Sequence, residues 1–175
     1  EKKINIIVVS KLEKQKGIDI LIESLSKVKI KYKFNCDIYG KGTLFDNIEK
    51  IIKKNNLEKS IKIKKTKALN RVYRKYDLYI LSSYYEGYPN SLVEAMISGL
   101  PVISSSCDYG PKEIILNKYN GILFKAGSQI DLTKKIEFVA NNYNLASEFG
   151  RRAKRSYDAT QINKTNLEKW LKIIR

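Results

Sequence analysis

The chain has 175 residues, of which 43% are hydrophobic and 30% charged. This length and composition suit one globular domain with a sizeable core and exclude an intrinsically disordered chain. Histidine is absent, which excludes a histidine base and histidine metal ligands, and no run is long and apolar enough to cross a membrane. Cys36 and Cys107 lack metal-binding spacing, so we expect free thiols in a reducing compartment. Because we recognise no signal peptide and the first residue is not methionine, we expect a cytoplasmic fragment of a longer protein.

The formal net charge is +16, from 34 lysine and arginine residues against 18 aspartate and glutamate residues. Three interpretations are open: a solvated lysine-rich surface, attraction to an anionic membrane surface, and binding to nucleic acid. The basic residues are spread over the whole length and no nucleic-acid-binding motif occurs, so we expect no nucleic-acid partner. An anionic membrane surface stays open as a partner.

The first half of the chain predicts strands that alternate with helices. A β-branched run over 4–9 is typical of a buried strand, and apolar residues from Ile18 to Val28 recur on one helical face. Thr43 with Asp46 indicates an N-cap pair for the next helix. The expected elements are strands over 4–9, 33–39 and 60–64, a helix over 18–28, a helix that buries residues between 44 and 52, and a short helix over 70–76.

The second half continues the alternation around a strand–loop–helix–strand unit between Leu78 and Ser104. Such a unit is one βαβ element of a parallel sheet. Ser128 is the expected N-cap of a later helix. The expected elements are strands over 78–81, ending at 103 and over 121–124, a helix that starts near 91, a helical turn over 112–116, and helices over 128–141, 144–156 and 160–174.

Strands alternate with helices about six times, which predicts an α/β fold. We expect a doubly wound, Rossmann-like parallel sheet of about six strands, with helices on both faces, as one domain over 1–175. Ligands bind such sheets at the carboxyl ends of the strands, so the loops that follow the strands surround one site. These loops contribute Lys11 and Lys16, the Gly40-x-Gly42 turn, the segment 86–90 and the segment 108–111.

Glu94 has two competing interpretations. Ser91-x-x-Glu94 matches a capping box, in which the serine accepts from the third helical amide and the glutamate reaches back to the cap amide. Alternatively, Glu94 is a carboxylate that accepts two ribose hydroxyls, as acidic residues do in other nucleotide sites. The spacing alone favours neither interpretation.

An anion site is predicted beside Glu94. The helix start at 90–92 would offer free amides and the positive end of a dipole, and Lys11 and Lys16 would add charge, so a diphosphate would fit there. Glu86 lies in a tight loop after a buried strand, where a carboxylate accepts sugar hydroxyls or carries a proton. For each of these charged residues, a solvated surface side chain is the alternative.

Several catalytic motifs are absent from the sequence. It contains no GxxxxGK[ST], no GxSxG and no carboxylate cluster of metal type. These absences argue against a kinase, an α/β-hydrolase and a metal-dependent enzyme. We therefore expect neither a metal nor a cofactor.

The segment from Glu86 to Ile103 resembles the group 1 (family 4) retaining glycosyltransferases of GT-B fold. Their C-terminal, donor-binding domain carries an E-x7-E motif in the form EGxPxxxxEAMxxGxPVI. Further segments are similar to other family motifs, in the family's order: 10–12 with 16–17 (GRL…KG), 38–42 (G-x-G), 110–114 (GPxEI) and 120–124 (NGxLF). The resemblance covers nearly the whole chain and implies one half of a GT-B fold.

The resemblance assigns roles to these residues. Glu86 would contact the donor sugar as the catalytic carboxylate, Glu94 would bind the ribose, and Lys11 with Lys16 would neutralise the diphosphate. The turn over 64–67 would lie along the nucleobase. The loop and helix start between the two glutamates would bind sugar and diphosphate through backbone amides; these residues are Gly87, Tyr88, Pro89, Asn90, Ser91 and Leu92.

The implied reaction transfers a hexose or an N-acetylhexosamine from a nucleotide-sugar to a glycan or lipid-linked acceptor. The GPKEI segment resembles members that use UDP-linked donors. Configuration at the anomeric carbon would be retained, and positive side chains would act in place of a metal. Many similar enzymes work at the inner face of a membrane, which the net charge suits. A non-catalytic nucleotide-binding module and a basic adaptor for membrane or nucleic acid are the alternatives.

Two departures from the family pattern matter. The family's Gly-Arg pair is Ser10-Lys11 here, and lysine offers a point charge where arginine offers a bidentate fork. The chain also matches only the second of the two GT-B domains. Because the acceptor half is missing from it, we expect this chain to bind the donor but to transfer little or no sugar by itself.

Overall fold

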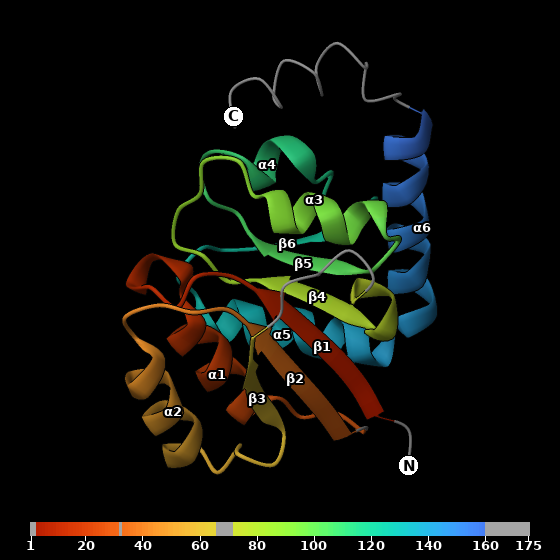
Figure 1. Cartoon of the computed structure of the whole chain (residues 1–175). Coiled ribbons are helices and arrows are strands. Elements are labelled where there is room, and N and C mark those ends of the chain that lie inside the picture. The colour runs from red at the N-terminus through yellow and green to blue at the C-terminus, as the bar shows by residue number, and fades with distance from the viewer. Residues whose placement is uncertain (1–2, 32, 66–71, 160–175) are drawn as a thin grey trace.

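The computed structural model describes residues 3–31, 33–65 and 72–159, and it contains a parallel sheet of six strands (Figure 1). The strands are β1 (Lys3–Val9), β2 (Lys33–Tyr39), β3 (Ile61–Lys64), β4 (Leu78–Leu81), β5 (Val102–Ser105) and β6 (Ile122–Phe124). Their order across the sheet is β3-β2-β1-β4-β5-β6. The chain winds outward from β1 in one direction and from β4 in the other, which confirms the doubly wound, Rossmann-like fold.

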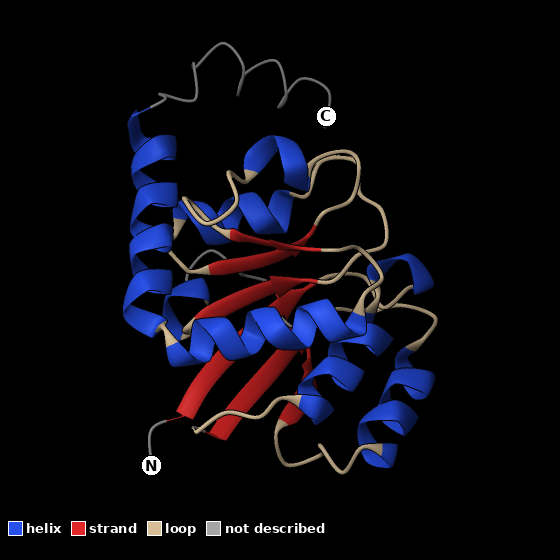
Figure 2. Cartoon of the chain, turned by 180° about the vertical axis from the view of Figure 1, so that it is seen from behind, coloured by secondary structure: helices blue, strands red, loops and turns tan. Residues whose placement is uncertain are grey.

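Helices cover both faces of this sheet (Figures 1 and 2). They are α1 (Ile18–Lys27), α2 (Phe45–Lys54), α3 (Asn90–Ile97), α4 (Pro111–Ile114), α5 (Gln129–Asn141) and α6 (Tyr143–Ala159), with 3₁₀ turns η1 (Lys14–Lys16) and η2 (Tyr73–Lys75). Helix α1 packs against α2 and α5 on one face, whereas α3 packs against α6. The view from behind shows α5 lying across the sheet (Figure 2).

Alternating side chains of the strands divide the core into two parts. In β1, Ile6 and Val8 point into the cluster that α1, α2 and α5 cover, while Ile7 points into the cluster covered by α3. In β4, Ile80 belongs to the first cluster and Tyr79 to the second. Because both faces of these central strands are largely buried, β4 reads as an apolar run and β1 is apolar from Ile4 to Val9 except for Asn5.

The start of α2 differs from the expectation. The helix begins at Phe45 with Leu44 as its N-cap, and no side chain caps it. The predicted Thr43–Asp46 cap pair is wrong, because the amide and the hydroxyl of Thr43 both donate to the Glu13 carboxylate, at 3.1 and 2.8 Å. The Thr43 side chain thus links the loop after β2 to the loop after β1 and does not cap the N-terminus of α2.

The N-cap predicted at Ser128 is confirmed, since its hydroxyl accepts a hydrogen bond from the Asp131 amide at 3.2 Å. Elsewhere the ends of elements shift by one to three residues, as expected for boundaries read from sequence. Among the differences, β5 continues to Ser105, α4 begins at Pro111 and α6 ends at Ala159. The expected helix over 70–76 is a 3₁₀ turn at 73–75, and its first residues lie outside the described part. The helix expected over 160–174 also lies outside the described residues.

Both cysteines are free thiols, as expected. Cys36 lies on β2 and Cys107 follows β5, and burial raises the pKa of each thiol above its ordinary value. Thiols that stay protonated are poor nucleophiles, so neither is a candidate for covalent catalysis. In the described part of the chain, no helix has the length and apolar character needed to cross a membrane.

Close contacts hold the loop after β1 against the loop after β4. The Tyr84 amide donates to the Gln15 carbonyl at 2.8 Å, and the Ser82 hydroxyl donates to the Lys16 carbonyl at 2.8 Å. Gly17 has a φ of +58°, and a Cβ there would lie 2.3 Å from the Ser82 carbonyl oxygen. Because only glycine permits this approach, the position of Lys16 is tied to the loop after β4.

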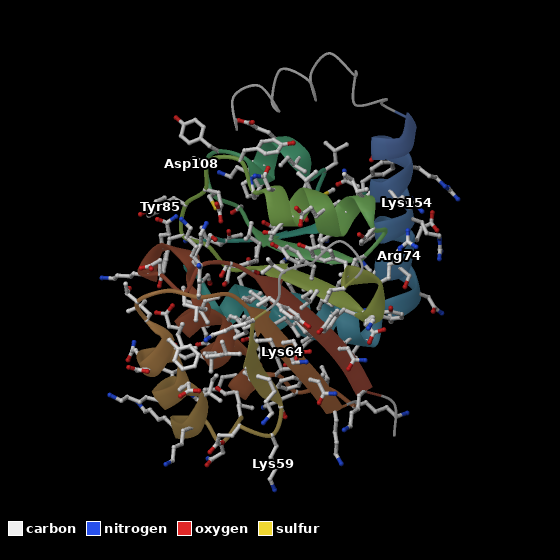
Figure 3. The ribbon with its side chains drawn as sticks, viewed as in Figure 1. Lys59, Lys64, Arg74, Tyr85, Asp108 and Lys154 are labelled. Carbon is white, nitrogen blue, oxygen red and sulfur yellow. The ribbon has the colours of Figure 1, made fainter. Side chains whose placement is uncertain are left out.

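The loop after β5 packs against the loop after β4 from its other side. Gly110 has a φ of +76°, and a Cβ there would lie 2.3 Å from the Gly87 carbonyl oxygen and 2.8 Å from Pro89 Cδ. Tyr85 and Asp108, which belong to these two loops, lie at the same end of the molecule (Figure 3). The loops after β1, β4 and β5 therefore support one another at the carboxyl end of the sheet.

We expect Gly110→Ala to lower the free energy of unfolding by about 2 kcal/mol, because alanine is strained at positive φ and its Cβ would overlap the neighbouring loop. Gly87→Ala is the matched control, since nothing lies within 4 Å of a Cβ placed at Gly87. That variant is expected to change the free energy of unfolding by less than about 0.5 kcal/mol. Urea unfolding followed by circular dichroism measures both values, and equal losses would contradict the described packing of Gly110.

Candidate functional site

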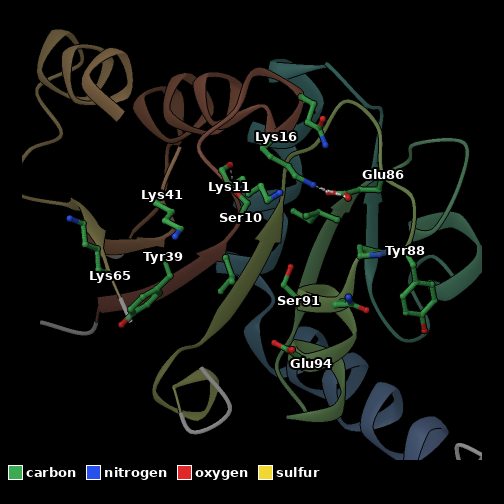
Figure 4. A pocket seen from close by; sticks show the side chains of 16 residues that line it. Ser10, Lys11, Lys16, Tyr39, Lys41, Lys65, Glu86, Tyr88, Ser91 and Glu94 are labelled. Carbon is green, nitrogen blue, oxygen red and sulfur yellow. Dashed lines mark hydrogen bonds and ion pairs between the residues drawn. The ribbon is translucent and has the colours of Figure 1, made fainter. Parts of the chain in front are cut away.

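A cleft of about 650 Å³ opens at the carboxyl ends of the strands (Figure 4). It lies at the switch point between β1 and β4, where doubly wound sheets bind ligands. Its lining residues are Val9, Ser10, Lys11, Gln15, Lys16, Tyr39, Gly40, Lys41, Lys65, Leu81, Glu86, Tyr88, Pro89, Asn90, Ser91 and Glu94. The sequence-predicted site residues all line it except Gly87 and Leu92, whereas the segment 108–111 does not.

Lys16 and Glu86 form an ion pair at one end of the cleft (Figure 4). Nζ of Lys16 lies 2.8 and 2.9 Å from Oε1 and Oε2 of Glu86, and the Ser83 hydroxyl donates to Oε1 at 2.6 Å. The two side chains are only 15% and 8% exposed, so their attraction is screened less than that of a surface pair. Two donors from different loops therefore orient the Glu86 carboxylate.

The capping box predicted for Ser91 and Glu94 does not form. Helix α3 begins at Asn90 with Pro89 as its N-cap, so Ser91 lies inside the first turn. The hydroxyl of Ser91 bonds instead to the Tyr79 hydroxyl at 2.8 Å. The capping interpretation of Glu94 is therefore wrong, and its exposed side chain lines the cleft.

Two tyrosines that were not predicted as site residues lie beneath this helix. Tyr73 and Tyr79 are fully buried, with ring centroids 6.2 Å apart. The Tyr73 hydroxyl donates to Oε2 of Glu94 at 2.8 Å. Burial raises the pKa of both phenols far above the ordinary value, so both hydroxyls keep their protons. No local sequence signal marks these residues, because their partners lie on another element.

The first turn of α3 offers fewer free amides than predicted. The Asn90 amide donates to the Tyr88 carbonyl at 3.1 Å, and the Leu92 amide donates to the Pro89 carbonyl at 3.0 Å. The Leu92 side chain is fully buried in the core. Among the described residues we find no acceptor for the Ser91 amide, which leaves it as the candidate for binding an anion at this helix end.

Tyr39 and Lys65 lie across the cleft from Glu86 (Figure 4). The turn over 64–67 was predicted to lie along a nucleobase, and only Lys65 of its described residues lines the cleft. Lys64 instead pairs with Asp37 at 2.6 Å, and this hydrogen bond raises the pKa of Lys64. Residues 66 and 67 lie outside the described part of the chain.

The ring of Tyr39 is held in place by its neighbours. Its hydroxyl lies 2.9 Å from that of Tyr76, which donates to Asp37 at 2.5 Å. Nζ of Lys64 lies 5.9 Å from the centroid of the Tyr39 ring. Burial raises the pKa of Tyr76, so its phenol stays a donor. A fixed aromatic ring at the edge of a cleft can stack on a flat group such as a nucleobase.

The charges that line the cleft suit an anion flanked by hydroxyl groups. Lysines outnumber carboxylates among the lining residues: Lys11, Lys16, Lys41 and Lys65 stand against Glu86 and Glu94. A cleft lined mainly by one sign of charge concentrates ligands of the other sign, and carboxylates accept hydrogen bonds from hydroxyls. Gln15 and Tyr39 were not predicted as site residues, and Lys41 was included only as the middle residue of the Gly40-x-Gly42 turn. The signal available for Tyr39 was its place at the end of a predicted strand.

Residues 1–156 match the model of the family described as Glycosyl transferases group 1. The chain belongs to this family. The resemblance that the E-x7-E segment indicates is thereby confirmed. Both glutamates of that segment lie in the cleft.

Relatives of this family member carry related activities in their names. Poly(ribitol-phosphate) alpha-N-acetylglucosaminyltransferase of Staphylococcus aureus (strain COL) is 36% identical over 169 residues, which cover 94% of this chain and 34% of that protein. The GtfA subunit of UDP-N-acetylglucosamine–peptide N-acetylglucosaminyltransferase of Limosilactobacillus reuteri subsp. suis is 35% identical over 141 residues, which cover 80% of this chain and 28% of that protein. The chain thus spans about a third of the length of these relatives.

Solved structures of GT-B glycosyltransferases share the fold. A crystal structure of a mutant of S. aureus TarM, in complex with fondaparinux, alpha-GlcNAc-glycerol and UDP, matches with a TM-score of 0.85 and 32% identity. That match covers 96% of this chain and 34% of TarM. The C-terminal domain of the Francisella tularensis group 1 glycosyl transferase LpcC matches with a TM-score of 0.78 and 24% identity, over 86% of this chain and 82% of that domain. The fold is therefore that of the expected C-terminal half.

Proposed function

We propose that this chain is the donor-binding part of a glycosyltransferase that transfers an N-acetylhexosamine or a hexose from a UDP-sugar. The observation that carries the proposal is the placement of Glu86 and Glu94 in one lysine-lined cleft at the switch point of the sheet. Relatives named as N-acetylglucosaminyltransferases, of which GtfA is named for a UDP-linked donor, support N-acetylglucosamine as the sugar.

The proposed donor lies along the cleft in the order base, ribose, diphosphate and sugar. The base stacks beside Tyr39 and Lys65, and Glu94 accepts hydrogen bonds from the ribose hydroxyls. The diphosphate lies over the start of α3, near Lys11 and Lys16, and the sugar reaches Glu86. Lys16 and Glu86 form an ion pair in this structure. When the donor binds, the Lys16 ammonium pairs with the diphosphate instead, and the Glu86 carboxylate becomes available to the sugar.

In the proposed reaction, the bond between the anomeric carbon and the diphosphate oxygen breaks and its electron pair leaves with UDP. The acceptor oxygen bonds to the anomeric carbon on the same face, so configuration is retained, and the acceptor hydroxyl gives its proton to the departing diphosphate oxygen. Lysine charges and the dipole of α3 stabilise the charge that grows on the diphosphate, which is the task a metal performs in other enzymes. We propose that no metal is required.

The acceptor site is proposed to lie in the remainder of a longer protein, because the relatives are about three times the length of the segment matched here. Residues beyond this chain would therefore recognise the acceptor, which is expected to be a glycan or a lipid-linked molecule. The chain alone is expected to bind UDP but to transfer little sugar, which a labelled donor measures. Robust transfer by this chain would contradict a separate acceptor domain.

Calorimetric titration of this chain with UDP, GDP and ADP tests the donor site. We expect saturable binding of UDP, with GDP and ADP weaker, because the relative GtfA is named for a UDP-linked donor. Inorganic diphosphate is the control for attraction to lysines alone, and it is expected to bind more weakly than UDP and to lose affinity steeply with salt. If UDP does not bind at millimolar concentration, or binds no better than diphosphate, the proposed function is wrong.

A further inference from the structure

The exposed side chain of Glu94 is held by a hydrogen bond from the buried residue Tyr73. Its carboxylate lines the cleft, yet Oε2 accepts a hydrogen bond at 2.8 Å from the hydroxyl of Tyr73, which has no exposed surface. An exposed glutamate ordinarily samples several rotamers and loses that freedom when a ligand binds. Here one oxygen is held from below, so the rotamers open to Glu94 are already restricted.

Tyr73 is itself held in a fixed position. The backbone of Tyr73 begins the 3₁₀ turn η2, and its ring packs on Tyr79 with centroids 6.2 Å apart. Both rings belong to the core cluster that lies under α3. The Tyr73 hydroxyl therefore reaches Glu94 from a fixed position, and it does so as a donor because burial keeps it protonated.

The hydrogen bond leaves Glu94 able to bind further donors. An ionised carboxylate has about four lone-pair positions, of which the phenol occupies one. Oε1, for which no partner is found in the described part of the chain, and the remaining positions on Oε2 can accept two hydroxyl groups of a vicinal diol. A carboxylate already in its binding orientation loses less conformational entropy on binding, which raises affinity.

We propose that Tyr73 is a positioning residue that holds the Glu94 carboxylate ready to accept the ribose hydroxyls of the donor nucleotide. This inference rests on the proposed function. Tyr79 serves as a comparison within the same cluster, since it is equally buried but its hydroxyl bonds to Ser91 and not to a carboxylate. The inference therefore concerns one hydroxyl and one carboxylate, and it predicts an effect limited to ligands that carry a ribose diol.

The test compares UDP with 2′,3′-dideoxy-UDP, which lacks both ribose hydroxyls, by calorimetry on this chain and on Tyr73→Phe. We expect Tyr73→Phe to weaken UDP binding about tenfold, roughly the cost of ordering one freely rotating side chain when the ligand binds. Its affinity for the dideoxy nucleotide is expected to stay within about twofold of the wild-type value, because neither hydroxyl is there to be bound. The discrimination between the two nucleotides thus falls about tenfold.

Tyr79→Phe is the matched control, and it is expected to change both affinities by the same factor, so that discrimination is unchanged. In a Glu94→Ala background, Tyr73→Phe is expected to have no effect on UDP binding, which completes a double-mutant cycle. Thermal unfolding checks that each variant is folded. If Tyr73→Phe does not fold, Glu94→Gln, which keeps the phenol and weakens the same bond, must reduce discrimination instead.

Three outcomes overturn the inference in different ways. If the wild type binds UDP and discrimination is the same in Tyr73→Phe, the positioning role is wrong while the proposed function stands. If the wild type does not bind UDP, the proposed function is wrong and the inference falls with it. A Tyr73→Phe variant that loses affinity for both nucleotides equally has only a structural defect, which also overturns the positioning role.

Discussion

Glu94→Ala is expected to weaken the binding of UDP to this chain by about a hundredfold. The carboxylate would accept two ribose hydroxyls, and each hydrogen bond to a charged group contributes about 1.5–3 kcal/mol. The variant also leaves the buried Tyr73 hydroxyl without its acceptor, so we expect the free energy of unfolding to fall by about 1–2 kcal/mol. Calorimetric titration and urea unfolding measure the two effects separately.

Glu49→Ala is the control for this experiment. Glu49 is an exposed glutamate on α2 that does not line the cleft, so its loss removes the same charge without touching the site. It is expected to change UDP affinity by less than about twofold. An affinity of Glu94→Ala within threefold of the wild type would mean that the cleft binds the nucleotide without this carboxylate, and the ribose assignment would fail.

Glu86→Gln is expected to act in opposite directions on transfer and on nucleotide binding. In the complete enzyme, we expect sugar transfer to fall by about a thousandfold, a loss typical of removing a catalytic acid–base or electrostatic group. In this chain, we expect UDP affinity to rise roughly threefold. The Glu86 carboxylate pairs with Lys16, and the uncharged amide of the variant would leave the Lys16 ammonium available to the diphosphate. A radiolabelled UDP-sugar follows the transfer, and calorimetry follows the binding.

The opposite signs separate a catalytic role from a folding defect, which would lower both quantities. Lys16→Met supplies the counterpart, since it removes the other half of the ion pair and is expected to weaken UDP binding by about tenfold. If Glu86→Gln transfers sugar at close to the wild-type rate, Glu86 is not the catalytic carboxylate. If it binds UDP much more weakly than the wild type, the pair with Lys16 supports the cleft and does not compete with the diphosphate.

The elements of the fold could be read from the sequence because their signals are local. Buried parallel strands appear as apolar runs, such as 78–81, and amphipathic helices appear as apolar residues on one face, such as α1. The alternation of strands and helices is compatible with few topologies. In such a sheet the ligand site lies at the carboxyl ends of the strands, so the predicted strand ends locate it. These rules place Glu86, Glu94, Lys11 and Lys16 at one site, and the resemblance of the E-x7-E segment assigns their roles.

The side-chain partners could not be read from the sequence, because they are distant along the chain. Ser91 matched a capping box, but Tyr79, which lies 12 residues earlier on the neighbouring strand, takes its hydroxyl. Thr43 matched a helix cap, but Glu13, 30 residues earlier, takes both of its donors. A polar side chain bonds to the partner that tertiary packing brings nearest. Local sequence patterns include only the partners that are close along the chain.

The sequence by itself determined the doubly wound sheet, the family and the cleft in which Glu86 and Glu94 lie, because strand and helix periodicity and the spacing of the E-x7-E segment are properties of neighbouring residues. Only the tertiary structure decided that Lys16 pairs with Glu86, 70 residues away, and that Tyr73 holds Glu94, 21 residues away. These contacts form between loops and elements that meet when the sheet assembles. Hydrogen bonds and ion pairs depend on angstrom-scale distances, which sequence spacing does not contain.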